Sequence, residues 1–231
     1  RHVGAEHVQQ AILGAQSGRV PEGNVGAGTG TECLGFKGGI GSSSRKLPAS
    51  KGGYTVGVLV QTNFGGVLNI NGAPVGRELH NFYMKDPNEA YKADGSCMIV
   101  IATDAPLSAR NLERLAKRSY LAFGNVGSFS SNGSGDYSIA FSTATANRIA
   151  HNAADKAVSN TEDLSNDAMS PLFLAVWEAT EEAILNSMFA ATDMQGRNKR
   201  EVKALPIQKT VEILKKYNAL QHDNLPKALK N

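Results

Sequence analysis

Two serines at element boundaries, each with glycine beside it, are the residues with the clearest potential for chemistry. Ser96 lies in DGSCMIV and Ser134 in NGSGDYS, and each precedes a run typical of a β-strand. A hydroxyl in such a place can project beyond the sheet edge and act as a nucleophile, although each serine taken singly is more often a turn residue. Together with Asn63, which ends VQTN, and Asp136, they form a set of polar groups at strand ends, a usual place for a site.

Other kinds of site find less support. The glycine-rich residues 22–41 lack a G-K-[ST] signature, and no strand leads directly into them with a helix following, so we interpret the glycines as permitting tight turns and close backbone approach. The five histidines show no HxxxH or HxH spacing and no neighbouring carboxylate cluster, so we expect no metal. A Ser-His-Asp triad is not excluded by chain order, but no serine lies in GxSxG.

Composition excludes several partners. The chain has 231 residues, enough for a sizeable core, and its net charge of +3 is spread along the sequence and gives no reason to expect nucleic acid or a membrane surface. Cys33 and Cys97 have no CxxC partner, so we expect buried thiols. No apolar run approaches the roughly 20 residues that span a bilayer, and the first residues do not resemble a signal peptide. We therefore expect a soluble protein, cytoplasmic or periplasmic, or one whose targeting segment is absent from this chain.

Helices and strands are arranged so that they can hold these polar groups. Apolar periodicity and turn signals predict an amphipathic helix over residues 2–16, which Gly18 ends, a strand over 54–63 and a hairpin over 67–75 around Asn71-Gly72. They then predict a second strand over 97–103 and a helix over 108–123. The predicted strand 54–63 and the predicted hairpin 67–75 deliver loops close to one another.

The second half of the chain predicts one more strand and two helices. Residues 136–144 alternate large apolar with small side chains, the pattern of a half-buried strand with Tyr137, Ile139 and Phe141 on its apolar face. Residues 145–169 are polar and irregular, typical of a flap. Ser170-Pro171 predicts a helix with the serine as N-cap, and Pro206 begins the last helix. Strands followed by long helices indicate an α+β fold with packed layers in one domain.

Seven blocks of the sequence, in order and over nearly the whole chain, resemble one known family: EGNVGAGTGT, GFKGGIGSSSR, YTVGVLVQTNFG, GAPVGREL, DGSCMIVIATDAPL, NGSGDYSIAFSTA and GR...VKALP. The family is that of the P1 peptidases, the DmpA/BapA group of L-aminopeptidase D-Ala-esterase/amidases and β-aminopeptidases. The resemblance implies an αββα four-layer sandwich like that of N-terminal-nucleophile hydrolases, with its own connectivity. Family members also carry an N-terminal segment before RHVGAEHV, which this chain lacks and which supplies part of the substrate pocket.

The resemblance further implies that the protein cuts itself between Gly95 and Ser96. One P1 peptidase-like domain, residues 1–231, then becomes two pieces: residues 1–95, the C-terminal part of an α subunit, and residues 96–231, the β subunit. After scission Ser96 would own an α-amino group with a pKa of about 7.7 to 8. One residue then supplies both nucleophile and base, and the preceding glycine permits the backbone geometry that self-attack requires.

By the same resemblance, Ser134 and Asp136 orient Ser96 or relay protons, while Asn63 and Gly135 stabilise the oxyanion. Some family members have glutamate in place of Asp136, which leaves the hydrogen-bond partner of the shorter carboxylate open. The implied protein is a serine aminopeptidase or amidase that releases small L-, D- or β-residues from peptides, amides or esters through an acyl-enzyme, without cofactor or metal, as a tetramer of αβ units. Two alternatives are an ornithine acetyltransferase-like acyltransferase, a group that uses threonine as its new terminus, and a truncated binding domain that stays uncut.

Overall fold

The protein is described by a computed structural model that covers residues 2–86, 95–149, 151, 158 and 160–220. Its centre is a four-stranded sheet in the order β3-β4-β5-β6, formed by Ile40–Lys46, Thr55–Gln61, Met98–Thr103 and Tyr137–Ser142. The pairs β3–β4 and β4–β5 are antiparallel, and β6 runs parallel to β5. The strands predicted from the sequence around 54–63, 97–103 and 136–144 are therefore present.

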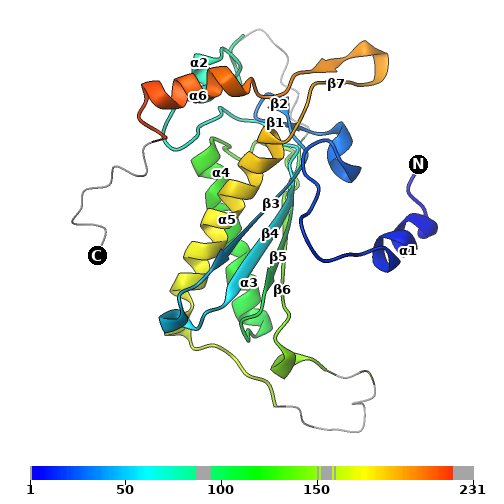
Figure 1. Ribbon diagram of the computed structural model, residues 1–231, viewed down its shortest axis with the longest axis vertical. Coiled ribbons are helices and arrows are strands. Elements are labelled where there is room, and N and C mark those ends of the chain that lie inside the picture. Colours follow the sequence, from blue (N-terminus) through cyan, green and yellow to red (C-terminus); the bar gives the residue numbers. More distant parts are fainter. Residues whose placement is uncertain (1, 87–94, 150, 152–157, 159, 221–231) are drawn as a thin grey trace.

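Three helices cover one face of this sheet (Figure 1): α3 (Ala109–Ser119), α4 (Leu121–Val126) and α5 (Ser170–Phe189). Alternate valines of β4 point toward them and are buried, as the period-two spacing of strand side chains requires. Gly41 of β3 lets α5 approach closely, because a Cβ there would lie 1.9 Å from the carbonyl oxygen of Ala183. The reading of such glycines as points of close backbone approach is thus confirmed at this position.

Two helix predictions need correction. The single helix expected over 108–123 is two helices that meet at Tyr120, the C-cap of α3 and the N-cap of α4. Ser170 is the first residue of α5 and not its cap, because Met169 occupies the N-cap position and makes no side-chain capping bond. No helix in the described ranges, α5 included, has the apolar length to cross a lipid bilayer.

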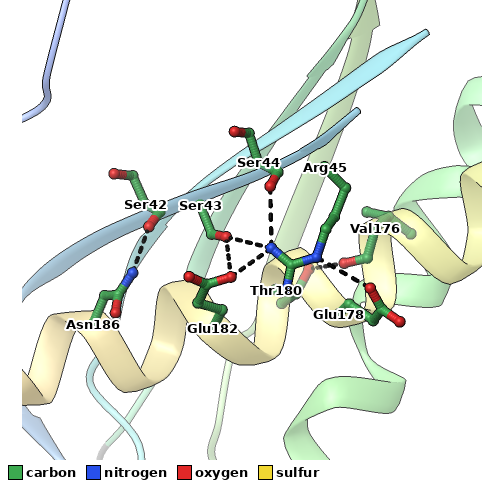
Figure 2. Close-up of polar contacts among 9 residues, drawn as sticks. All are labelled: Ser42, Ser43, Ser44, Arg45, Val176, Glu178, Thr180, Glu182 and Asn186. Atoms are coloured by element: carbon green, nitrogen blue, oxygen red, sulfur yellow. Dashed lines mark hydrogen bonds and ion pairs between the residues drawn. The ribbon is translucent and has the colours of Figure 1, made fainter. Parts of the chain in front are cut away.

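An ion-pair network fastens the edge strand β3 to α5 (Figure 2). The guanidinium of Arg45 bonds to Glu178 at 3.1 Å and to Glu182 at 2.5 Å, and Ser43 donates a hydrogen bond of 2.7 Å to the same Glu182 oxygen. One turn further along α5, the Asn186 side chain donates to a backbone carbonyl of β3. These contacts fix the helix along the strand.

The other face of the sheet is open among the described residues. Tyr137, Ile139 and Phe141 of β6 are 62%, 57% and 44% exposed, whereas the small residues between them face α3. The alternation predicted for a half-buried strand is present, and the large residues lie on the face that points away from the helices. α3 lies so close to β6 that the Ser119 hydroxyl hydrogen-bonds to Ser138, which leaves room only for small side chains on that side.

Short elements gather at one end of the sheet (Figure 1): the hairpins β1–β2 (Glu32–Cys33, Phe36–Lys37) and β7–β8 (Met194–Gln195, Glu201–Val202), with helices α2 (Val75–Glu78) and α6 (Ile207–Lys216). The predicted turn at Asn71-Gly72 has positive φ at both residues, 49° and 83°, but only an isolated bridge flanks it instead of a full hairpin. α6 begins just after Pro206, as predicted.

The remaining segments carry short turns and one free-standing helix. α1 (Ala5–Leu13) ends at Gly14, earlier than Gly18, and buries no residue. Short 3-10 turns occupy η1 (Gly26–Gly30), η2 (Ala49–Lys51) and η6 (Arg197–Lys199). The segment 145–169, predicted as an irregular flap, lies partly outside the described residues; its described part contains the turns η3 (Thr145–Asn147) and η5 (Asn166–Ala168).

Candidate active site

The site lies at the end of the sheet where β4 finishes and β5 begins. Gln61 pairs with Met98 in the antiparallel ladder, so the residues just beyond each strand are neighbours. The backbone N-H of Ser96 donates a hydrogen bond to the carbonyl oxygen of Asn63. The structure therefore brings together Asn63 and Ser96, which the sequence placed at strand ends.

The hydroxyl of Ser96 lies against the peptide bond that it is expected to attack. Its Oγ donates a hydrogen bond of 2.5 Å to the carbonyl oxygen of Gly95. A Cβ at residue 95 would lie 2.6 Å from the carbonyl oxygen of Asn63, so only glycine fits there without displacement. Gly95 is thus required by space at this position.

A serine and a carboxylate stand on the other side of Ser96, in the loop that precedes β6. The Ser134 hydroxyl donates to both carboxylate oxygens of Asp136 at 3.0 Å, and the Cys97 N-H donates to one of them at 2.8 Å. The parallel pairing of β5 and β6 places this loop beside Ser96. These two donors are the partners that the shorter carboxylate reaches.

Gly135 provides the direct contact between this loop and the nucleophile. Its backbone N-H donates to the Ser96 Oγ at 3.2 Å. Among the described residues, neither the Ser134 hydroxyl nor the Asp136 carboxylate hydrogen-bonds to Ser96 itself. The four predicted residues near Ser96 are therefore assembled, with Gly135 bonded to its hydroxyl oxygen and Asn63 to its nitrogen.

The side chain of Asn63 is oriented by a residue that the sequence did not identify. The backbone N-H of Glu32 donates to the Asn63 Oδ1 at 3.2 Å. This identifies Oδ1 as the accepting atom of the amide and leaves Nδ2 as its donor, which has no hydrogen-bond partner in the described ranges. An amide donor beside the nucleophile is the arrangement needed to stabilise an oxyanion.

Tyr120 is a second contributor that the sequence did not identify. Its hydroxyl donates to the backbone carbonyl of Asp136 at 2.5 Å, and its ring stacks on Phe123. Burial, with the nearby Asp136 carboxylate second, raises the pKa of Tyr120, so the hydroxyl keeps its proton and remains a donor. No pattern around residue 120 signals this role, because it arises from the break between α3 and α4.

The two cysteines near the site are not its nucleophiles. Cys33 and Cys97 are free and fully buried, as predicted. Burial raises the pKa of Cys33 to about 12 and holds the pKa of Cys97 well above its usual range, so both stay protonated thiols. In the described ranges no group of three or more His, Cys, Asp or Glu side chains could share a metal ion.

Comparison with known proteins shows the family to which the chain belongs. The profile of the family described as "Peptidase family S58" matches residues 1–202. The chain belongs to peptidase family S58. Two relatives named "Beta-peptidyl aminopeptidase BapA" agree with it: the protein of Sphingosinicella microcystinivorans is 44% identical over 95% of this chain, and that of Sphingosinicella xenopeptidilytica is 40% identical over 91%. The S58 chain spans 58% and 54% of the lengths of these two relatives.

Solved structures agree with the S58 assignment. The PH0078 protein from Pyrococcus horikoshii OT3 has a TM-score of 0.82 at 45% identity, over 94% of this chain and 58% of its own. A Burkholderia sp. β-aminopeptidase has a TM-score of 0.81 at 40% identity, over 93% of this chain and 59% of its own. The L-aminopeptidase D-Ala-esterase/amidase from Ochrobactrum anthropi has a TM-score of 0.81 at 36% identity, over 92% of this chain and 57% of its own. Its structure is described as a variant of the Ntn hydrolase fold. The predicted α+β fold of N-terminal-nucleophile type is confirmed, and the described residues form one helix layer and one sheet of it.

Proposed function

We propose that this S58 chain carries the nucleophile of a self-processing serine aminopeptidase or amidase. The observation that carries the proposal is the 2.5 Å hydrogen bond from the Ser96 hydroxyl to the Gly95 carbonyl, in a site that also holds Asn63, Gly135 and the Ser134–Asp136 pair. The names of the relatives support the aminopeptidase class. Serine at position 96 favours this class over a threonine-dependent acyltransferase.

Self-cleavage would begin with attack of the Ser96 Oγ on the carbonyl carbon of Gly95. A bond forms between Oγ and that carbon, the Gly95–Ser96 carbon–nitrogen bond breaks, and the hydroxyl proton passes to the Ser96 nitrogen. Water then hydrolyses the resulting ester, which frees the Gly95 carboxylate and restores the Ser96 hydroxyl. Two pieces result, residues 1–95 and 96–231.

In turnover the new α-amino group of Ser96 would act as the base, because its pKa of about 7.7 to 8 suits neutral pH. The Asn63 carbonyl, which already accepts from this nitrogen, would hold the amine in place. Ser96 Oγ would attack the substrate carbonyl carbon, the bond from that carbon to the leaving nitrogen or oxygen would break, and the leaving amine or alcohol would take the proton that the α-amino group accepted from the hydroxyl. Water would then hydrolyse the acyl-enzyme ester, which releases the amino acid and restores the Ser96 hydroxyl. The Asn63 amide and the Gly135 N-H would stabilise the developing negative charge, while Ser134 and Asp136 orient groups and transfer protons.

The substrates proposed are peptides, amides or esters with a free amine and a small N-terminal L-, D- or β-residue. These follow the names of the relatives, which include β-peptidyl aminopeptidases and an L-aminopeptidase D-Ala-esterase/amidase. A tetramer of αβ units stays a prediction from family resemblance, which the native mass would test. The truncated, uncut binding domain is the alternative from another class.

Intact mass of the complete gene product, followed by a small substrate panel, tests the proposal. We expect two fragments, one of which begins Ser-Cys-Met-Ile, and hydrolysis of the p-nitroanilides of alanine or β-alanine. Ser96→Ala should abolish both scission and hydrolysis, since one hydroxyl serves both. A single uncut chain that hydrolyses nothing would favour the binding domain, and full activity on N-acetylated substrates would favour a general amidase.

A further inference from the structure

A cavity of about 440 Å³ is lined in part by Glu32, the residue whose backbone N-H bonds to the Asn63 side chain. One wall is formed by residues 29–32 and the other by the hairpin β7–β8 with its connecting turn, at the end of the sheet that also carries β1 and β2 (Figure 1). Glu32 joins the cavity to the site: its side chain lines the cavity, and its backbone N-H holds Asn63. The volume falls in the range of about 300 to 1,000 Å³ that is usual for small-molecule sites.

The charged groups of this cavity favour an anion. Three cationic side chains line it, Lys37, Arg197 and Arg200, against one carboxylate, Glu32. Arg200 is paired with Glu32 at 2.6 Å, and the buried Lys37 ammonium donates to three backbone carbonyl oxygens. Arg197 has no acidic partner in the described part of the chain. Its guanidinium is therefore available to a ligand.

Strained backbone holds the two arginines on one turn. Asn198 and Lys199, which lie between them, both have φ of +59°, the left-handed region that residues other than glycine rarely adopt. Two consecutive residues of this kind cost free energy that the surrounding structure must offset, and such strain concentrates at functional sites. The turn thereby aims Arg197 and Arg200 into one cavity.

We infer that this cavity binds the carboxylate of the amino acid that leaves when a short peptide is hydrolysed, with Arg197 as its main ligand. The inference rests on the proposed aminopeptidase function. A cationic cavity repels the ammonium of the substrate. The acyl part of the substrate, which carries this ammonium, then lies away from the cavity, and the leaving part lies toward it. A guanidinium binds a carboxylate through two parallel hydrogen bonds, which gives both affinity and orientation. The preferred substrates are then free dipeptides, not longer or amidated chains.

The test compares β-alanyl-alanine with β-alanyl-alaninamide, measured by release of β-alanine from the complete gene product. We expect kcat/KM to favour the free acid by about tenfold or more, the effect of a charged hydrogen bond. Arg197→Gln should remove this preference and leave the amide and the β-alanine p-nitroanilide unaffected, while Arg197→Lys should retain part of it. Lys199→Gln is the matched control, because it removes a positive charge from the same turn at a residue that does not line the cavity.

The outcomes separate this inference from the proposed function. If the unmodified protein hydrolysed none of these substrates, the p-nitroanilide included, the proposed aminopeptidase function would be refuted. Hydrolysis of the p-nitroanilide with equal rates on acid and amide would refute only the carboxylate site. A preference that survives Arg197→Gln, or that Lys199→Gln reduces equally, would show that the cavity does not recognise the carboxylate.

Discussion

Replacing Gly95 by alanine tests the geometry of self-cleavage directly. The added Cβ would lie 2.6 Å from the Asn63 carbonyl oxygen and 3.1 Å from the Phe64 Cα. The first distance must grow to at least 3.0 Å, below which real Cβ contacts essentially never occur, so the backbone moves by about 0.4 Å or more. That movement separates Ser96 from the two groups that position it, the Asn63 carbonyl and the Gly95 carbonyl.

The size of the effect follows from this displacement. A misplacement of 1 Å at a reacting centre can cost about a hundredfold in rate. If the cost scales exponentially with distance, a shift of 0.4 Å predicts scission that is about five- to tenfold slower. The fold is not expected to fail, because a displacement of this size costs about 1 to 3 kcal/mol where side chains are overpacked.

Cell-free synthesis with a labelled amino acid, chased and resolved on a denaturing gel, measures the rate at which the precursor disappears. Gly65→Ala is the matched control, since a Cβ at residue 65 would meet nothing within 4 Å. Scission of Gly95→Ala at the unmodified rate would refute the close contact with Asn63. An equal slowing by Gly65→Ala would show that the effect is not specific to the scissile bond.

Four further substitutions and one labelling experiment address the rest of the site. Asn63→Ala should lower kcat by about 10² to 10³ with little change in KM, because its Nδ2 acts on the transition state; a change confined to KM would make it a pocket residue. Ser134→Ala and Asp136→Asn should likewise lower kcat more than they raise KM. Tyr120→Phe should lower kcat by a smaller factor with an unchanged melting temperature, since the Tyr120 hydroxyl bonds only to the Asp136 backbone. Full kcat in Tyr120→Phe would show that Tyr120 does not belong to the site. A thiol reagent at pH 8 should label neither cysteine in the folded protein and both after unfolding, because burial raises the pKa of both thiols and keeps them protonated. Rapid labelling of the folded protein would contradict their burial.

The sequence predicts the side chains of the site better than it predicts its backbone donors. Ser96, Ser134 and Asn63 are recognisable because polar residues beside glycines mark strand ends, and the ladder register then brings those ends together. Glu32 and Tyr120 act through a backbone N-H and on a backbone carbonyl respectively. Every residue but proline has an N-H, so residue type carries no signal for that kind of role.

The face that β6 presents to the helices could not be predicted by the alternation rule, for a reason that lies in the fold. In a four-layer sandwich each sheet has helices on one face and a second sheet on the other, so both faces are covered and apolarity does not tell them apart. The continuous apolar run of β5 has this character. In β6 the small residues face α3, and the large ones, Tyr137 and Phe141, lie on the open face with Met98 beside them. Side-chain size, more than apolarity, therefore indicates which layer each face of β6 meets. Sheets pack about 10 Å apart, and large side chains fill that gap. α3, by contrast, packs so closely on β6 that the Ser119 hydroxyl hydrogen-bonds to Ser138.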